Sequence, residues 1–175
     1  LSRVVVGGGQ KTNLVVAVME LARRLGVLPE LGEDNEVKEG SEHELLEAIY
    51  DPEQPGSLAR NIRSVMWSAT HVRERLSLDH WHSLSRLQRD QQAALKVHPT
   101  LTEAIAFLDR VLGVSSSLTG FAMDNMTRDD GWRFLMIGRR LERLSFLAMT
   151  VAHFLRMPST RSPGSLEWLL ELSDS

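Results

Sequence analysis

The chain has 175 residues, 42% of them hydrophobic and 25% charged, with a formal net charge of −3. This length suits one domain with a sizeable core, and the composition is ordinary for a globular protein. A domain dedicated to nucleic acid would be strongly basic, so we expect no nucleic-acid partner. Because the chain contains no cysteine, disulfides and thiolate metal sites are excluded, and a reducing cytoplasm suits the composition.

Residues 1–12 are predicted to be a flexible segment or linker. The opening LSRVVVGGGQ has neither the length nor the pattern of a signal peptide, and no run in the chain approaches 18 uncharged apolar residues. We therefore expect a cytoplasmic protein with no membrane segment. The glycines do not form a phosphate loop, because Gln10 separates Gly9 from Lys11, whereas the Walker motif places glycine next to lysine.

Helix signals follow from residue 13 onward. An apolar run predicts a helix over residues 13–25 that ends at Gly26, and the acidic segment 30–40 is predicted to be a loop. The residues SEHE at 41–44 form a capping box, in which a Ser and a Glu three residues later satisfy free backbone N–H groups. A short helix is predicted from this box to Tyr50, where an Asp-Pro pair breaks it.

Two longer helices are predicted next. Ser57 is placed to cap a helix that extends to about Leu76, and Ser77 is placed to cap another that extends to about Leu95. The first of these helices carries an apolar stripe with a spacing of three to four residues, made of Leu58, Ile62, Val65, Ala69, Val72 and Leu76.

The second half of the chain begins with another capping box, formed by Thr100 and Glu103. It opens a helix that is expected to kink or fray over residues 113–120, which are rich in Ser and Gly. Thr127 is predicted to cap the longest helix, which has two acids at the positive end of its dipole and extends to Met157.

A last helix is predicted to start at Ser162-Pro163. Apart from the isolated Val4–Val6, nothing in the chain resembles a strand. The predicted fold class is therefore all-α, an antiparallel helical bundle of about six or seven helices joined by short loops. We expect a single bundle domain over residues 13–175.

The histidines do not predict a metal site. His80 and His82 are two residues apart on a predicted helix and so point to different sides. Di-iron sites in helical bundles need two Glu-x-x-His motifs, and the chain has none. We expect no metal and no other cofactor.

Trp67 is the first candidate contact residue. It projects away from the apolar stripe of its helix, beside Arg60, Arg63 and His71. One interpretation is a second packing contact against a neighbouring helix. The other is an exposed aromatic side chain, flanked by arginines, that docks a partner, since Trp and Arg are enriched at such anchors.

The stretch MTRDDGWRFLMIGRRLERL at residues 126–144 concentrates charge on one helix. On a helical projection, Glu142 falls within a line of otherwise apolar or small residues, namely Leu135, Gly138, Phe146 and Met149. A carboxylate removed from water there is costly unless it is paired, so we expect a semi-buried Glu142 with Arg139 as its partner.

Three further arginines, Arg133, Arg140 and Arg143, lie over the other side of this helix, near Trp132. Two interpretations stay open at this point. The charges form a structural ion-pair network that fixes how helices meet, or the arginines in excess of the acids hold an anionic ligand or an acidic peptide.

The same stretch resembles the signature of the alpha-E domain family, bacterial all-helical domains with a Glu-Arg motif, here Glu142-Arg143. Softer matches are DPEQPGSL at 51–58, VRERLSLDHWHSL at 72–84 and SLEWLLELSDS at 165–175. The resemblance covers roughly residues 41–175.

The chain also departs from the family pattern. Where the family usually has Arg-Glu-Asn-Ala-Arg, this chain has Met66-Trp67-Ser68-Ala69-Thr70, so part of a polar network is expected to be missing. The opening Glu-Arg helix of the family is not recognisable in residues 1–30. A further helical portion normally follows residue 175, so the domain is expected to be incomplete at its carboxyl end relative to the family.

The family has no established reaction, and what the resemblance implies is a context. Such domains occur fused to, or encoded beside, circularly permuted ATP-grasp ligase-like proteins and transglutaminase-like proteases. The resemblance therefore implies a non-catalytic accessory domain that works with an ATP-grasp ligase-like partner in amide-bond formation or peptide tagging. A transglutaminase-like protein is the second implied partner, and the oligomeric state is left open.

No catalytic residue is assigned. The candidate ligand- or partner-binding residues are Trp67, Trp132, Arg133, Arg139, Arg140, Glu142 and Arg143. The alternatives to an interaction domain are an anionic ligand pocket built by the arginines of residues 133–143 and a purely structural bundle.

Overall fold

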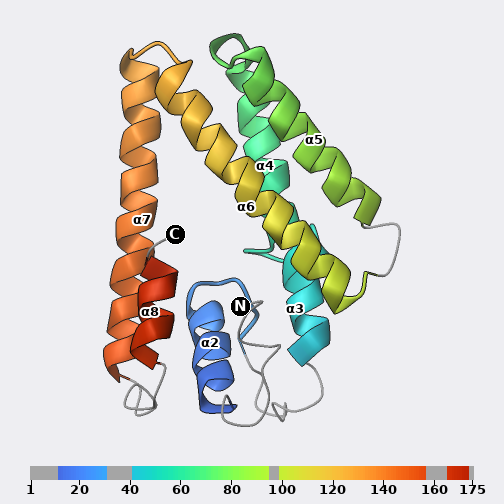
Figure 1. The fold of residues 1–175 in the computed structure, drawn as a ribbon, viewed down its shortest axis with the longest axis vertical. Helices are drawn as coiled ribbons and strands as arrows, with labels where there is room; N and C mark the ends of the chain where they lie inside the picture. Colours follow the sequence, from blue (N-terminus) through green and yellow to red (C-terminus); the bar gives the residue numbers. More distant parts are fainter. Residues whose placement is uncertain (1–11, 31–40, 95–98, 157–164, 174–175) are drawn as a thin grey trace. The chain divides into compact units, whose positions relative to one another are not determined.

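The computed structural model describes residues 12–30, 41–94, 99–156 and 165–173 (Figure 1). Within these ranges the regular structure consists of seven α-helices and one 3-10 turn. The predicted all-α fold is confirmed. The chain divides into two compact units, one made of residues 1–29 with 134–175 and the other of residues 30–133. A single domain over residues 13–175 stays a prediction.

The second unit contains four helices and the 3-10 turn. These are α3 (Ser41–Tyr50), α4 (Leu58–His71), η1 (Arg73–Arg75), α5 (Leu78–Ala94) and α6 (Leu101–Asp124). Helix α4 packs against α3 and α5, and α6 packs against α3 and α5. The main core cluster joins all four helices and consists of Tyr50, Ile62, Leu87, Ala104 and Phe107. The rings of Tyr50 and Phe107 are stacked, with centroids 5.6 Å apart.

Three of the predicted caps in this unit are confirmed. The Ser57 hydroxyl accepts a hydrogen bond from the Arg60 backbone N–H, and the Ser77 hydroxyl accepts one from the backbone N–H of His80. Thr100 and Glu103 form the complete reciprocal capping box at the start of α6. The cap predicted at Ser41 lies outside the described side chains, and so does the loop over residues 31–40.

The face that α4 buries differs from the prediction. Ala59, Ile62, Met66 and Ala69 are buried, whereas Val65 and Val72 of the predicted stripe are exposed. Both stripes have the helical spacing of three to four residues, so the period alone could not choose between them. The helix also ends at His71, five residues before the predicted end, and η1 follows it.

Helix α6 neither kinks nor frays over its Ser- and Gly-rich part, so that prediction was wrong. It continues as one helix to Asp124. The hydroxyls of Ser116, Ser117 and Thr119 each donate to the backbone carbonyl four residues earlier, so these polar groups are satisfied within the helix. Among the described residues, α6 is the one helix long and apolar enough to cross a membrane by length and composition. That is weak support for a span, and the expected absence of a membrane segment stays a prediction.

The longest helix, α7 (Asp130–Arg156), begins in the second unit and continues in the first. Its cap is Asp129 and not Thr127, because the Asp129 carboxylate accepts the hydrogen bond from the backbone N–H of Trp132, 3.1 Å away. The chain reaches the helical conformation only after Asp129, two residues beyond the predicted cap.

The first unit consists of α2 (Thr12–Arg24), the rest of α7 and α8 (Ser165–Ser173). Helix α2 ends at Arg24, one residue before the predicted end. Gly26 follows as the predicted stop and has a φ of 70°, which a side chain would disfavour. The core cluster is made of Val18, Leu21 and Trp168, with Phe154 of α7 packed against it. On the same side of α7, the His153 imidazole Nε2 lies 3.2 Å from the Ala17 carbonyl of α2. The predicted start of the last helix at Ser162-Pro163 lies outside the described residues.

Candidate interaction site

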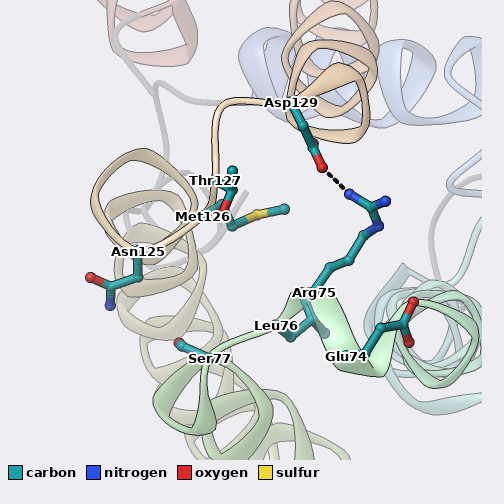
Figure 2. A pocket seen from close by; sticks show the side chains of 8 residues that line it. All are labelled: Glu74, Arg75, Leu76, Ser77, Asn125, Met126, Thr127 and Asp129. Atoms are coloured by element: carbon teal, nitrogen blue, oxygen red, sulfur yellow. Dashed lines mark hydrogen bonds and ion pairs between the residues drawn. The ribbon is translucent and has the colours of Figure 1, made fainter.

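A pocket in the second unit forms where two connections meet, one between α4 and α5 and one between α6 and α7 (Figure 2). Its volume is about 320 Å³. It is lined by Glu74, Arg75, Leu76, Ser77, Asn125, Met126, Thr127 and Asp129. Figure 2 shows the side chains of Arg75 and Asp129 pointing toward each other from the two connections, where they form an ion pair.

Both carboxylate oxygens of Asp129 have partners. One carboxylate oxygen accepts from the Trp132 backbone, and the other pairs with the Arg75 guanidinium. The hydrogen bond from Trp132 lowers the pKa of the Asp129 carboxyl below its ordinary value, and the bond from Arg75 lowers it further. A Cβ atom at Gly131 would lie 3.2 Å from both the Arg75 and the Asp129 side chain, so the glycine leaves room for this pair.

Trp132 also belongs to this junction. Its indole Nε1–H donates to the Ala122 carbonyl of α6 at 2.9 Å, and the Arg128 guanidinium lies over its ring at 5.6 Å. The side chain is half-buried. Its interactions therefore join the first turn of α7 to the end of α6 within the second unit, and it presents little free surface for a partner.

Glu74 and Arg75, the Glu-Arg pair that lines the pocket, were not predicted as site residues. The tetrapeptide Glu-Arg-Leu-Ser occurs twice, at residues 74–77 and at 142–145. The first copy supplies half of the pocket lining, and the second lies on exposed turns of α7. The identity of the two tetrapeptides was the signal that could have directed attention to Glu74 and Arg75.

Trp67 is exposed, with 67% of its surface accessible, so the packing interpretation is wrong for the described residues. Its ring lies against the His71 imidazole, with centroids 4.3 Å apart. The two nearby arginines reach the segment before α4. Arg60 donates to the Glu53 carbonyl, and Arg63 bonds to the Glu53 carboxylate and the Pro52 carbonyl.

The arginines of α7 do not converge on one point. Arg133 pairs with Asp130 at 3.2 Å, and both side chains are exposed. Arg143 donates to the Ser173 carbonyl of α8 at 2.9 Å. Arg139 and Arg140 are exposed. These interactions place the arginines on several sides of the helix.

The expectation for Glu142 was wrong. Its side chain is exposed rather than semi-buried. Arg139 as its partner stays a prediction. The face that α7 buries in the first unit carries Thr150 and His153 instead. The helix is apolar on more than one side, so the projection used in the sequence analysis selected a line that the core does not use.

Another line of α7, which the sequence analysis missed, is apolar and uncovered. We call it the α7 seam, and its members are Phe134, Ile137, Leu141, Leu144, Ala148, Val151 and Leu155. The spacing alternates strictly between three and four residues. All seven side chains are exposed. The accessible fraction of the large ones ranges from 40% for Val151 to 74% for Phe134 and Leu155. The row is a continuous apolar line that the described residues of the first unit leave open to solvent.

Comparison with known proteins gives a family but no activity. A family model described as Alpha-E, a predicted alpha-helical domain with a conserved ER motif, matches residues 8–175. Uncharacterized proteins of Mycobacterium bovis and of two Mycobacterium tuberculosis strains are 30% identical over 125 residues, which is 69% of this chain. The match spans 14% of the length of these relatives. No solved structure matches. Because the family model covers nearly the whole chain, the protein belongs to the Alpha-E family.

Proposed function

We propose that this chain is a non-catalytic helical interaction module that binds an ATP-grasp ligase-like partner and supports amide-bond formation or peptide tagging. The α7 seam is the observation that carries the proposal. Monomeric proteins rarely leave contiguous apolar surface uncovered unless it serves an interaction. Three members of the seam, Phe134, Leu144 and Leu155, are 65% to 74% exposed.

Two candidate contacts lie on exposed surfaces as the proposal requires. Trp67 presents its ring to solvent, and Arg140 lies on the exposed side of α7 next to Leu141 of the seam. Exposed tryptophan and arginine side chains are the types most often found to dominate binding energy. The reaction itself belongs to the partner in this proposal, and a transglutaminase-like protein is the second candidate partner.

The test is co-purification with the ATP-grasp ligase-like protein encoded beside or fused to the domain. Arg140→Glu and Trp67→Ala are expected to leave the melting temperature unchanged, because both side chains are exposed, and to weaken capture of the partner. Arg86→Glu, the same charge reversal on an exposed residue of α5, is the control and should not affect capture. Loss of folding in both test variants, or full capture by both, would contradict the proposal.

A further inference from the structure

We infer that the α7 seam receives one amphipathic helix of a partner protein and that this helix has acidic residues along its flank. The inference rests on the proposed function and specifies the form of the partner at that site.

The spacing of the seam favours a helix over other ligands. The seven residues follow the three-four alternation of the a and d positions of a coiled coil over three heptads, from Phe134 to Leu155. A row of this period can face a second helix along its whole length. In a coiled coil, each side chain at an a or d position inserts between four side chains of the facing helix, and this packing continues only where the repeat is maintained. An extended peptide or a small ligand would not use a row about 30 Å long, given the rise per helical residue.

The residues that follow each d position are small. They are Gly138, Ser145 and Ala152, and they recur every seven residues. Small residues beside a seam allow two helix backbones to approach closely. A Cβ added to Gly138 would meet nothing within 4 Å, so no described residue occupies that space. The side of the seam that carries these residues is open.

Helix α7 is already packed on a different side. Thr150 and His153 are buried there, and Phe154 packs against the cluster around Trp168. An α-helix rotates by about 100° per residue, so the seam lies roughly 150° around the helix axis from this packed side. The exposed seam is therefore a second apolar face on a helix whose first face is in use.

Charge indicates what kind of helix fits. Between residues 134 and 156, α7 carries four arginines and one glutamate, a net charge of +3 with His153 neutral, although the whole chain has a net charge of −3. Arg140 occupies the position before Leu141, where coiled coils place the charges that select a partner. No acidic side chain pairs with Arg140 among the described residues. A second copy of α7 would bring a second positive helix against the first, so an acidic partner helix fits better.

The experiment uses the full chain and synthetic peptides of about 28 residues, which is four heptads. One peptide has leucine and isoleucine at the a and d positions with glutamate at the flanking e and g positions. The matched control has lysine at the same flanks, and a third peptide has the composition of the first in scrambled order. Like charges at the flanks keep each peptide from pairing with itself. Binding is followed by fluorescence anisotropy of the labelled peptide.

We expect the glutamate peptide to bind at least ~10-fold more tightly than the lysine peptide, because flanking charges select coiled-coil partners. Leu141→Asp should reduce binding by ~10-fold or more, since it places a charge within the seam. Met149→Asp, on an exposed residue of α7 outside the seam, is the matched control and should bind the glutamate peptide as tightly as the unsubstituted chain does. Arg140→Glu should remove or reverse the preference for glutamate.

Accessibility is measured in the same chain. Because the protein has no cysteine, Leu144→Cys introduces one thiol in the seam, and Met149→Cys provides the control. The seam thiol should react with a maleimide at a rate similar to the control and become protected when the glutamate peptide is bound. Sedimentation of the free chain should show a monomer.

Several results would overturn the inference. They are equal binding of the glutamate, lysine and scrambled peptides, absence of binding, self-association that protects the Leu144→Cys thiol, and a protected thiol in the monomer. Capture of the ATP-grasp ligase-like partner that is insensitive to Leu141→Asp would also overturn it and leave the proposed function intact. A chain that binds the glutamate peptide but never captures that partner would instead contradict the proposed function.

Discussion

The Arg75 guanidinium pairs with the Asp129 carboxylate, which lies 54 residues further along the chain. The pair joins η1 to the cap of α7, since the same carboxylate accepts the hydrogen bond from the Trp132 backbone. One aspartate thus both starts the longest helix and holds the two connections that form the pocket. The pairing with Arg75 could not be assigned from local sequence alone.

The first prediction concerns the pH dependence of stability. Hydrogen bonds from the Trp132 backbone and from Arg75 lower the pKa of Asp129 in the folded chain relative to its ordinary value of 3.8. A group with a lowered folded pKa stabilises the fold fully above its unfolded pKa, and this contribution is lost as the pH falls through the folded pKa. The melting temperature of the protein should therefore exceed that of Asp129→Asn at neutral pH, and the difference should shrink in acid below about pH 4.

Asp130→Asn is the control for this titration. Asp130 is the next residue, and its exposed carboxylate makes one ion pair, with Arg133. Exposed pairs of this kind contribute little to stability. Thermal unfolding monitored by circular dichroism at several pH values should show a smaller effect for Asp130→Asn, and an equal effect of the two variants would refute the assignment of Asp129.

The second prediction concerns the cap of α4. The Ser57 side chain is fully buried, accepts from the Arg60 N–H and donates to the Asp51 carbonyl. Ser57→Ala should lower the free energy of unfolding by about 1–2 kcal/mol, because both backbone groups lose their partner. Ser64→Ala, on the exposed side of the same helix, should be close to neutral. Denaturant titration measures both variants.

The third prediction compares two glycines. Gly138→Ala should raise the stability of the free chain by about 0.5–1 kcal/mol, because alanine favours the helix interior and its Cβ meets nothing within 4 Å. Gly26→Ala should lower stability, because Gly26 has a φ of 70°. If both variants change stability in the same direction, the conformations assigned to these glycines are wrong.

The fourth prediction concerns a buried hydroxyl in the first unit. Thr150 is 1% exposed, and its Oγ1 has no hydrogen-bond partner among the described residues. Thr150→Val keeps the shape and removes the unpaired polar atom, so it should raise the free energy of unfolding by about 1 kcal/mol. Thr150→Ser retains the hydroxyl and loses a methyl group, so it should be destabilising. A destabilising Thr150→Val variant would show that the hydroxyl has a partner.

Much of the helical structure was predictable from sequence because its signals are local. The caps at Ser57, Ser77 and Thr100, and the stop at Gly26, depend on residues within one turn of the helix end. The prediction was wrong at α7, where Thr127 was expected to cap the helix and Asp129, two residues later, does so. Arg75 also holds Asp129 from another part of the chain, a contact that local sequence does not indicate.

The candidate site was predictable only in part. Trp132 and the arginines of α7 were identified as notable, but the projection placed Glu142 in the buried face and overlooked the α7 seam. The seam follows a strict alternation that is visible in the sequence. It was missed because α7 carries apolar residues on more than one side, and a helical period does not say which side meets a neighbour.

The sequence by itself determined that this chain is helical, where most of its helices begin and end, and that it has the family motif. Those properties follow from backbone preferences and side-chain caps that act over three or four residues. Only the tertiary structure decided that Met66 rather than Val65 is buried, that Glu142 is exposed, and that Arg75 meets Asp129. Those outcomes depend on which surfaces meet across the fold, and a periodic pattern specifies a face without specifying its partner.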